Sequence, residues 1–155
     1  RLDQDSSGLV VFTQDGVLAR AIVGEGPSGR VEKEYIVGVA SPSGVLSTPK
    51  AQREVTARLS FGMWLDGCAL EPCLAEWLEP GARLRMVLKQ GRKRQIRRML
   101  EQLSLSCTLL HRTRIGGLQL GNLKVGRWRF FDRCELVGSA PRRAGADDRS
   151  CNDEA

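Results

Sequence analysis

The residues best suited to chemistry are an acid near the start of the chain and a dense group of arginines in its second half. Asp3 precedes an apolar run in the segment RLDQDSSGLVVFTQDG. The segment QGRKRQIRRML carries arginines beside an apolar helical face. A carboxylate can act as a nucleophile or as a general base, and arginines bind phosphates or orient a carboxylate. Together, the two segments indicate chemistry on a polyanion.

The acid segment has two competing interpretations. Asp3 and Asp5 would share a face on an extended backbone, and such a pair could bind a metal or include an aspartyl-phosphate nucleophile. Phosphatase motifs of that kind follow a buried strand, whereas here the apolar run comes after the acids. The simpler alternative is that Asp3 only caps a turn. The residues alone leave a catalytic Asp3 and a structural Asp3 open.

The arginine segment reads as an amphipathic helix. With Ile96 at the centre of its apolar stripe, Arg97 lies about 100° away at the border, and Arg98 lies about 200° away on the solvent side. A border residue can reach a cleft beside the core. The alternative is a basic helix that simply faces water. The stripe itself consists of Ile96, Met99, Leu100 and Leu103.

The charge is concentrated in one part of the chain. The 155 residues carry a net charge of +6 and are 41% hydrophobic, which suits a single domain with one core. Residues 83–129 hold thirteen of the 24 lysines and arginines but only one of the 18 acids. This block therefore carries +12 and the rest of the chain −6. Nucleic acid is the most common partner of such a patch, and a solvated charged face is the alternative.

Cysteine and histidine usage indicates no metal site and no disulfide framework. The five cysteines include no CxxC pair, and His111 is the only histidine. No apolar run approaches the roughly 20 residues that span a bilayer. The chain begins in mid-motif without Met, so we expect it to be a fragment. Reduced thiols suit a bacterial cytoplasm or an organelle, and secretion is not expected.

Short strands and helices alternate along the chain to position these residues. We expect a strand buried on both sides over residues 9–13 and a half-buried strand over 83–90. Further strands are expected over 33–40, 108–115 and 125–131, and helices over 16–23 and 48–59. Thr48 and Pro49 form an N-cap and first-turn pair for the last of these helices. Residues 138–155 form a polar segment without periodicity and are expected to be disordered.

Four segments together resemble the ribosomal pseudouridine synthases of the RsuA and RluF branch. They are RLDQDSSGLVVFTQDG, KEYIV, GRKRQIRRM and RTRIGGLQLGNLKVGRWR. They occur in the family's order and spacing, and the last is similar to enzymes of the large ribosomal subunit. The resemblance covers residues 1–137, which we expect to form the catalytic domain. The family's upstream Lys-Pro strand, and the S4-type domain that many members carry, are not matched here.

The resemblance implies a role for individual residues. Asp3 would be catalytic, Asp5 acidic but not catalytic, and Arg97 the base that ion-pairs with Asp3. Tyr35, the only tyrosine, is on composition grounds more often a core residue, but the family aromatic at this position lies against the target base. Lys93 departs from the usual Asn. The expected RNA contacts are Arg1, Arg92, Lys93, Arg94, Gln95, Arg98, Arg112 and Arg114, and the expected active-site floor is Leu2, Ile96 and Leu120.

The implied protein is a mixed α/β enzyme that isomerises a uridine in ribosomal RNA to pseudouridine. A mostly antiparallel sheet would carry an RNA cleft, with flanking helices. No cofactor or metal is expected, and the expected partner is a stem-loop of ribosomal RNA, from the large subunit, bound by a monomer. Two alternatives belong to other classes: an inactive RNA-binding or ribosome-assembly module of the same fold, or a ribosomal protein. A hydrolase of the Asp-x-Asp type is the weakest alternative.

Overall fold

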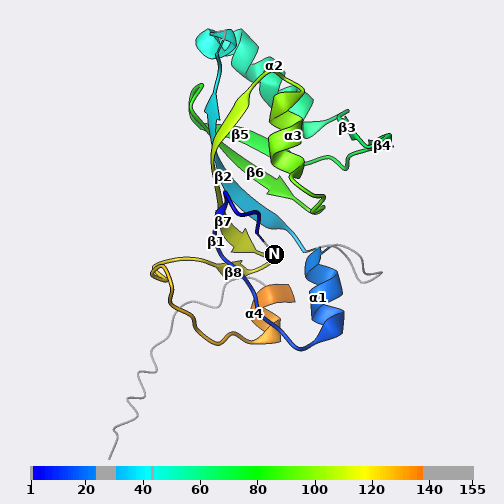
Figure 1. Ribbon diagram of the computed structural model, residues 1–155, viewed down its shortest axis with the longest axis vertical. Coiled ribbons are helices and arrows are strands. Elements are labelled where there is room, and N and C mark those ends of the chain that lie inside the picture. Colours follow the sequence, from blue (N-terminus) through cyan, green and yellow to red (C-terminus); the bar gives the residue numbers. More distant parts are fainter. Residues whose placement is uncertain (1, 24–30, 43, 138–155) are drawn as a thin grey trace, which may run out of the picture.

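A mixed sheet with helices packed on it forms the centre of the protein (Figure 1). The computed structural model describes residues 2–23, 31–42 and 44–137, so Arg1 and the polar tail of residues 138–155 lie outside the described residues. The strands are β1 (Ser7–Gly8), β2 (Lys33–Ala40), β3 (Trp64–Leu65), β4 (Cys68–Ala69), β5 (Leu74–Glu79), β6 (Arg83–Leu88), β7 (Ser106–Ile115) and β8 (Leu118–Gln119). The helices are α1 (Gly16–Val23), the 3-10 turn η1 (Val45–Ser47), α2 (Pro49–Ser60), α3 (Gln95–Glu101) and α4 (Arg133–Val137).

The order of strands in the main sheet is β1-β7-β2-β6-β5, with β8 paired to β7. The pairing of β1 with β7 is parallel, and the other described pairings are antiparallel. This confirms the expected α/β class with a mostly antiparallel sheet. Strand β2 lies between β6 and β7, so that Tyr35 stands opposite Met86 on one side and Arg112 on the other. The strand of the KEYIV segment is thus held from both sides.

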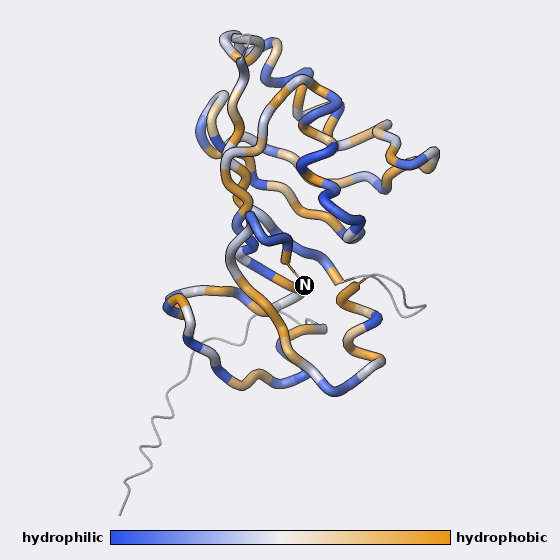
Figure 2. The backbone as a smooth tube through the Cα atoms, in the orientation of Figure 1, coloured by the Kyte–Doolittle hydropathy of each residue, from blue (hydrophilic) through white to orange (hydrophobic). Residues whose placement is uncertain are grey.

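The larger hydrophobic core lies between one face of the sheet and the helices α2 and α3. Val37, Leu84 and Met86 point from β2 and β6 into it and are fully buried. Helix α2 begins where the sequence predicts, because the Thr48 hydroxyl accepts a hydrogen bond of 3.2 Å from the Ala51 N–H. Figure 2 shows hydrophobic stretches along the sheet and hydrophilic residues in the loop before α3. The basic loop before α3 is therefore attached to a helix that packs on the hydrophobic core.

A smaller apolar cluster joins α1 and α4 at the other end of the sheet. Leu18 from α1 and Leu136 from α4 pack against Ile115 and Leu118 at the end of β7 and in β8. In Figure 1 these helices lie together below the sheet. The cluster anchors the segment that follows the predicted catalytic acid, since Leu9 and Val11 pack against it.

Two predicted strands do not form. Residues 9–13 were expected to be buried on both sides, but only Ser7 and Gly8 pair with β7, and Phe12 is 88% exposed. Leu9 and Val11 face the small cluster, whereas Val10 and Phe12 are exposed. Among the described residues, none therefore covers the second side of this segment. Residues 125–131 are irregular, because Gly121 and Gly126 adopt positive φ angles of 52° and 74° in turns.

Candidate functional site

Most of the predicted site residues converge on one open cavity of about 370 Å³ between the N-terminal segment, β2 and the loop that joins β6 to α3. The predicted residues that line it are Leu2, Asp3, Tyr35, Arg92, Lys93, Arg94, Gln95, Ile96 and Arg112. The other lining residues are Ser6, Ile22, Val23, Lys33, Leu88, Gln90, Gly91 and Leu110. Apart from Asp3, the ionisable groups in this lining are cationic or the phenol of Tyr35. The cavity is therefore suited to an anionic ligand that carries a flat apolar ring.

A tight turn places Asp3 at the cavity. The Ser6 N–H donates to the Asp3 carbonyl at 3.0 Å, and this closes a four-residue turn directly before β1. Gly8 lets the turn approach β7, because its φ is +108° and a Cβ there would lie 2.2 Å from the Arg112 carbonyl oxygen. The turn separates Asp3 from Asp5, so the two acids do not share one face as an extended backbone would require. This geometry removes the main argument for the alternative Asp-x-Asp site.

Arg97 binds Asp5 rather than Asp3, which corrects the predicted ion pair. The Arg97 Nη2 donates to the Asp5 main-chain carbonyl at 2.7 Å, and Nη1 donates to the Cys107 carbonyl at 3.1 Å. Arg97 Nε lies 3.3 Å from the Asp5 carboxylate but is not aligned for a hydrogen bond, so this contact is an ion pair only. Arg97 is 8% exposed and does not line the cavity. The turn presents Asp5 to α3 and Asp3 to the cavity, and a sequence cannot reveal that division.

Arg94, which is exposed, also binds the turn through the Asp5 carboxylate. Its guanidinium donates two hydrogen bonds of 3.2 Å to the two Asp5 carboxylate oxygens. These bonds, assisted by the charge of Arg97, hold the pKa of the Asp5 carboxyl below its ordinary value. Arg94 itself adopts a left-handed backbone conformation with φ 50° immediately before α3. Such a conformation is unfavourable for a residue with a Cβ, so the contact with Asp5 helps to maintain the loop.

Lys33 was missed in the sequence, although it lines the same cavity as Asp3 and Tyr35. It is only 4% exposed, and its Nζ donates to the Lys89 carbonyl at 3.1 Å. The signal that could have found it is the two-residue spacing from Tyr35, because alternate residues of a strand share a face. A lysine at the start of a strand is more easily read as a solvated end.

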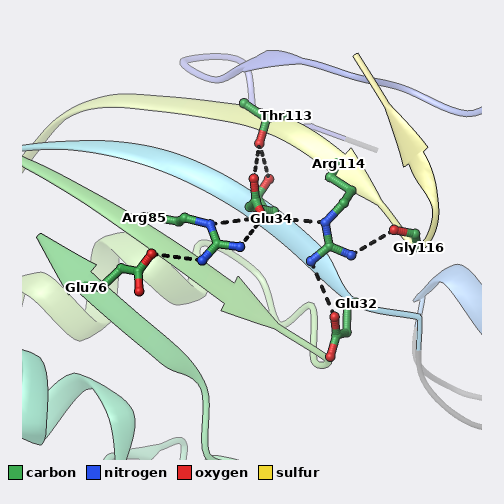
Figure 3. A network of polar contacts seen from close by, with 7 residues as sticks. All are labelled: Glu32, Glu34, Glu76, Arg85, Thr113, Arg114 and Gly116. Atoms are coloured by element: carbon green, nitrogen blue, oxygen red, sulfur yellow. Dashed lines mark hydrogen bonds and ion pairs between the residues drawn. The ribbon is translucent and has the colours of Figure 1, made fainter. Parts of the chain in front are cut away.

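Glu34 lies between Lys33 and Tyr35 and anchors β2 from the opposite face of the sheet (Figure 3). Its carboxylate accepts hydrogen bonds from Arg85 at 2.8 and 3.1 Å and from the Thr113 hydroxyl at 3.1 Å. Arg114 adds a contact of 3.4 Å. Burial alone would raise the pKa of Glu34, but the bonds from Arg85 and Thr113 and the two arginine charges outweigh it and lower the pKa. The network ties β2 to β6 and β7 beside the cavity.

Besides Arg97, three predicted site residues lie away from the cavity. Arg114 belongs to the Glu34 network on the other face, where it also pairs with Glu32 at 3.3 Å. Arg98 forms two hydrogen bonds of 2.6 and 2.9 Å with Asp66. Leu120 donates its N–H to the Thr113 carbonyl beside β8 and does not line the cavity. The basic surface at the cavity therefore comes mainly from Arg92, Lys93 and Arg94, and Arg112 lies buried in the lining.

Other kinds of site are sparse in the part of the chain that the structure describes. No group of three or more His, Cys, Asp or Glu side chains there could hold a metal ion. No helix among the described residues is long and apolar enough to cross a membrane. The four described cysteines are free thiols, and burial raises the pKa of Cys73 to about 11. A buried thiol of this kind is unreactive at neutral pH.

Comparison with known proteins gives concordant matches. Residues 1–102 match the family model described as RNA pseudouridylate synthase. The dual-specificity RNA pseudouridine synthase RluF of Escherichia coli K12 is 34% identical over 137 residues, which cover 88% of this chain and 43% of that protein. The ribosomal large subunit pseudouridine synthase B of Xylella fastidiosa is 36% identical over 123 residues, which cover 77% of this chain and 25% of that protein. The chain thus spans less than half the length of these relatives.

A solved structure shows that the likeness extends to the fold. The crystal structure of a pseudouridylate synthase superimposes with a TM-score of 0.70 at 26% sequence identity. The match covers 88% of this chain and 56% of the solved chain. The likeness in fold therefore extends over most of the chain.

Proposed function

Because the chain belongs to the RNA pseudouridylate synthase family, we propose that it isomerises a uridine of ribosomal RNA to pseudouridine in the cavity that holds Asp3 and Tyr35. The observation that carries this proposal is the meeting, among the described residues, of a single carboxylate, a single tyrosine and several cations in one open cavity. Relatives named for RNA and for the large ribosomal subunit support ribosomal RNA as the substrate. A stem-loop bound by one copy of the protein is the proposed complex, in a bacterial cytoplasm or an organelle.

Asp3 supplies the electron pair for the reaction. The carboxylate acts either as a nucleophile at the sugar C1′ or as a base, and in both routes the C1′–N1 bond breaks with its electrons going to the uracil ring. The ring then turns and its C5 bonds to C1′. In the nucleophilic route this step displaces the Asp3 carboxylate from C1′, and in the base route the proton that Asp3 removed from the sugar returns to it. The hydrogen on C5 is then lost as a proton while N1 gains one. Substrate and product are isomers, so no external oxidant, reductant or group donor is consumed.

Tyr35 and the cationic rim act on the base before the chemistry. A uridine inside an RNA helix is not accessible to Asp3, so it must leave its stack at a cost of a few kcal/mol. Stacking on the Tyr35 ring would restore about 1–3 kcal/mol. Phosphate contacts from the exposed Lys93 and the partly exposed Arg92 would offset the remainder. Arg97 acts as a positioning residue, because it holds the turn that carries Asp3.

Release of the C5 hydrogen provides a direct test. Ribosomal RNA labelled with tritium at uracil C5 is incubated with the protein and with the Asp3→Asn variant. We expect the wild-type protein alone to release tritium, and pseudouridine mapping of the treated RNA to show one or a few modified positions. An RNA-binding protein without activity would bind the RNA and release no tritium, and that outcome would disprove the proposal.

A further inference from the structure

Lys33 is a nearly buried cation in the proposed active site that none of the roles assigned so far uses. Its side chain is 4% exposed, and it lines the cavity together with Asp3 and Tyr35. Lysines are almost never this buried without a specific reason, because removal of an ammonium from water is costly. Its Nζ lies at the base of the loop before α3, where it donates to the Lys89 carbonyl and lies close to Gly91.

The position of Lys33 relative to Tyr35 suggests what it contacts. The two residues are separated by one position on β2, and both face the cavity. Such side chains stand about 7 Å apart along a strand, which is comparable to the width of a pyrimidine with its two exocyclic oxygens. A uracil stacked on the Tyr35 ring would therefore turn one edge toward Lys33. The Glu34 network on the opposite face fixes this part of β2 (Figure 3).

The proposed reaction creates a negative charge at that edge. When the C1′–N1 bond breaks, both electrons pass to the ring, and the charge spreads over N1 and the carbonyl oxygens at C2 and C4. The uracil anion would form beside a cation that is already nearly buried and fixed in place, and such a cation acts more strongly than one in bulk solvent. A group that stabilises this anion accelerates the bond cleavage without tightening the binding of the uncharged uridine.

We propose that Lys33 is a catalytic residue whose ammonium donates a hydrogen bond to a carbonyl oxygen of the departing uracil and stabilises its negative charge. This assignment rests on the proposed isomerase function. Three other cations of the cavity, like Lys33 itself, already donate to protein acceptors, and Lys93 is exposed at the rim. What distinguishes Lys33 is its place two residues from Tyr35 on the same strand. Arg94 is engaged by the Asp5 carboxylate, Arg92 donates to the Leu65 carbonyl at 3.0 Å, and the Arg112 Nε donates to the Leu9 carbonyl at 2.7 Å.

The test compares substrates that differ in the stability of the leaving group. A 5-fluorouridine at the target position leaves more readily than uridine, because fluorine withdraws electrons and stabilises the uracil anion. Single-turnover consumption of each nucleotide is measured in bound RNA, by nuclease digestion and chromatography, for the wild-type protein and for Lys33→Met. Lys50→Met removes an exposed lysine of α2 outside the cavity and serves as the matched control.

We expect Lys33→Met to slow uridine consumption by about 10²–10³-fold, the range found when one stabilising donor is removed from an active site. The loss on 5-fluorouridine should be at least several-fold smaller, and Lys50→Met should behave as the wild type. An equal loss on both nucleotides would overturn the proposal, because a lysine that only supports the loop does not sense the leaving group.

A second variant separates the charge from the hydrogen bond and covers the case in which Lys33→Met does not fold. Lys33→Gln keeps a donor for the Lys89 carbonyl but lacks the charge, so we expect it to show the same nucleotide-dependent defect. Wild-type rates in Lys33→Gln would overturn the assignment. Tritium release by the wild-type protein is measured in parallel. Its absence would contradict the isomerase function itself, whereas active wild type with fully active Lys33 variants would contradict only the role of Lys33.

Discussion

Arg97 holds the main-chain carbonyl of Asp5 at 2.7 Å and lies 3.3 Å from its carboxylate, so the buried arginine acts on the turn that carries Asp3 rather than on Asp3 itself. A second hydrogen bond, to the Cys107 carbonyl at 3.1 Å, ties the same guanidinium to β7. One side chain thus joins the N-terminal turn, α3 and the central sheet. Arg97 should therefore affect catalysis through the position of Asp3.

Removal of Arg97 should impair turnover far more than binding. Arg97→Met loses the bonds to Asp5 and Cys107, so we expect the single-turnover rate to fall about 10²-fold or more, as for a misplaced catalytic group. Its affinity for RNA should change little, because Arg97 does not line the cavity. Arg97→Lys should be intermediate, since an ammonium cannot reproduce a planar guanidinium. A variant with poor binding and normal turnover would contradict this role.

The two acids of the turn should separate in activity. Asp3→Asn removes the charge that the reaction needs, so we expect no detectable isomerisation and an RNA affinity within a few-fold of the wild type. Asp5→Asn keeps the main-chain carbonyl that Arg97 binds and loses only the carboxylate contacts, so it should retain measurable activity. Tritium release and filter binding on the same RNA check both variants. A fully active Asp3→Asn would refute the catalytic assignment.

The affinity for an RNA stem-loop should fall steeply with salt. Each phosphate neutralised contributes about 0.7–0.9 to the slope of log affinity against log salt. Lys93 is exposed at the cavity rim, so Lys93→Met should reduce this slope by about one contact. Arg98 is already paired with Asp66, and Arg98→Met should therefore have a smaller effect. Binding isotherms over a salt series decide this, and a slope near zero would indicate a partner that is not a polyanion.

Glu34 should stabilise the fold in a pH-dependent manner. Its folded-state pKa is lowered, so its contribution is complete above the ordinary glutamate pKa and is lost as the pH falls through the lowered value. Glu34→Gln should cost about 1–3 kcal/mol in unfolding free energy at pH 7, because two arginines lose their partner in a half-buried network. The difference from the wild type should shrink on acidification below about pH 4.5. Urea unfolding of both proteins at pH 7 and at a pH below 4.5 measures this. A stability difference that is the same at both pH values would exclude the ionised network as its cause.

The sequence by itself determined the positions of the helices and strands whose apolar residues recur with a clear helical or strand spacing. It placed α1 over residues 16–23, β2 over 33–40 and the start of α2 at Pro49, because propensity, capping and burial agree there. It also selected Asp3, Tyr35 and the loop before α3, since residue types in a fixed order resemble those of one family. These features depend on neighbours along the chain, and so they can be read from it.

The tertiary structure alone decided which of these groups meet. A turn closed by a single hydrogen bond gives Arg97 to Asp5 and leaves Asp3 at the cavity. The register of β2 with β7 sends Arg112 to the cavity, whereas Arg114 joins the Glu34 network on the opposite face. Lys33 is buried in the fold, where its Nζ donates to the Lys89 carbonyl. Such contacts join residues about 50 to 100 positions apart, and their geometry is fixed by packing rather than by local preference.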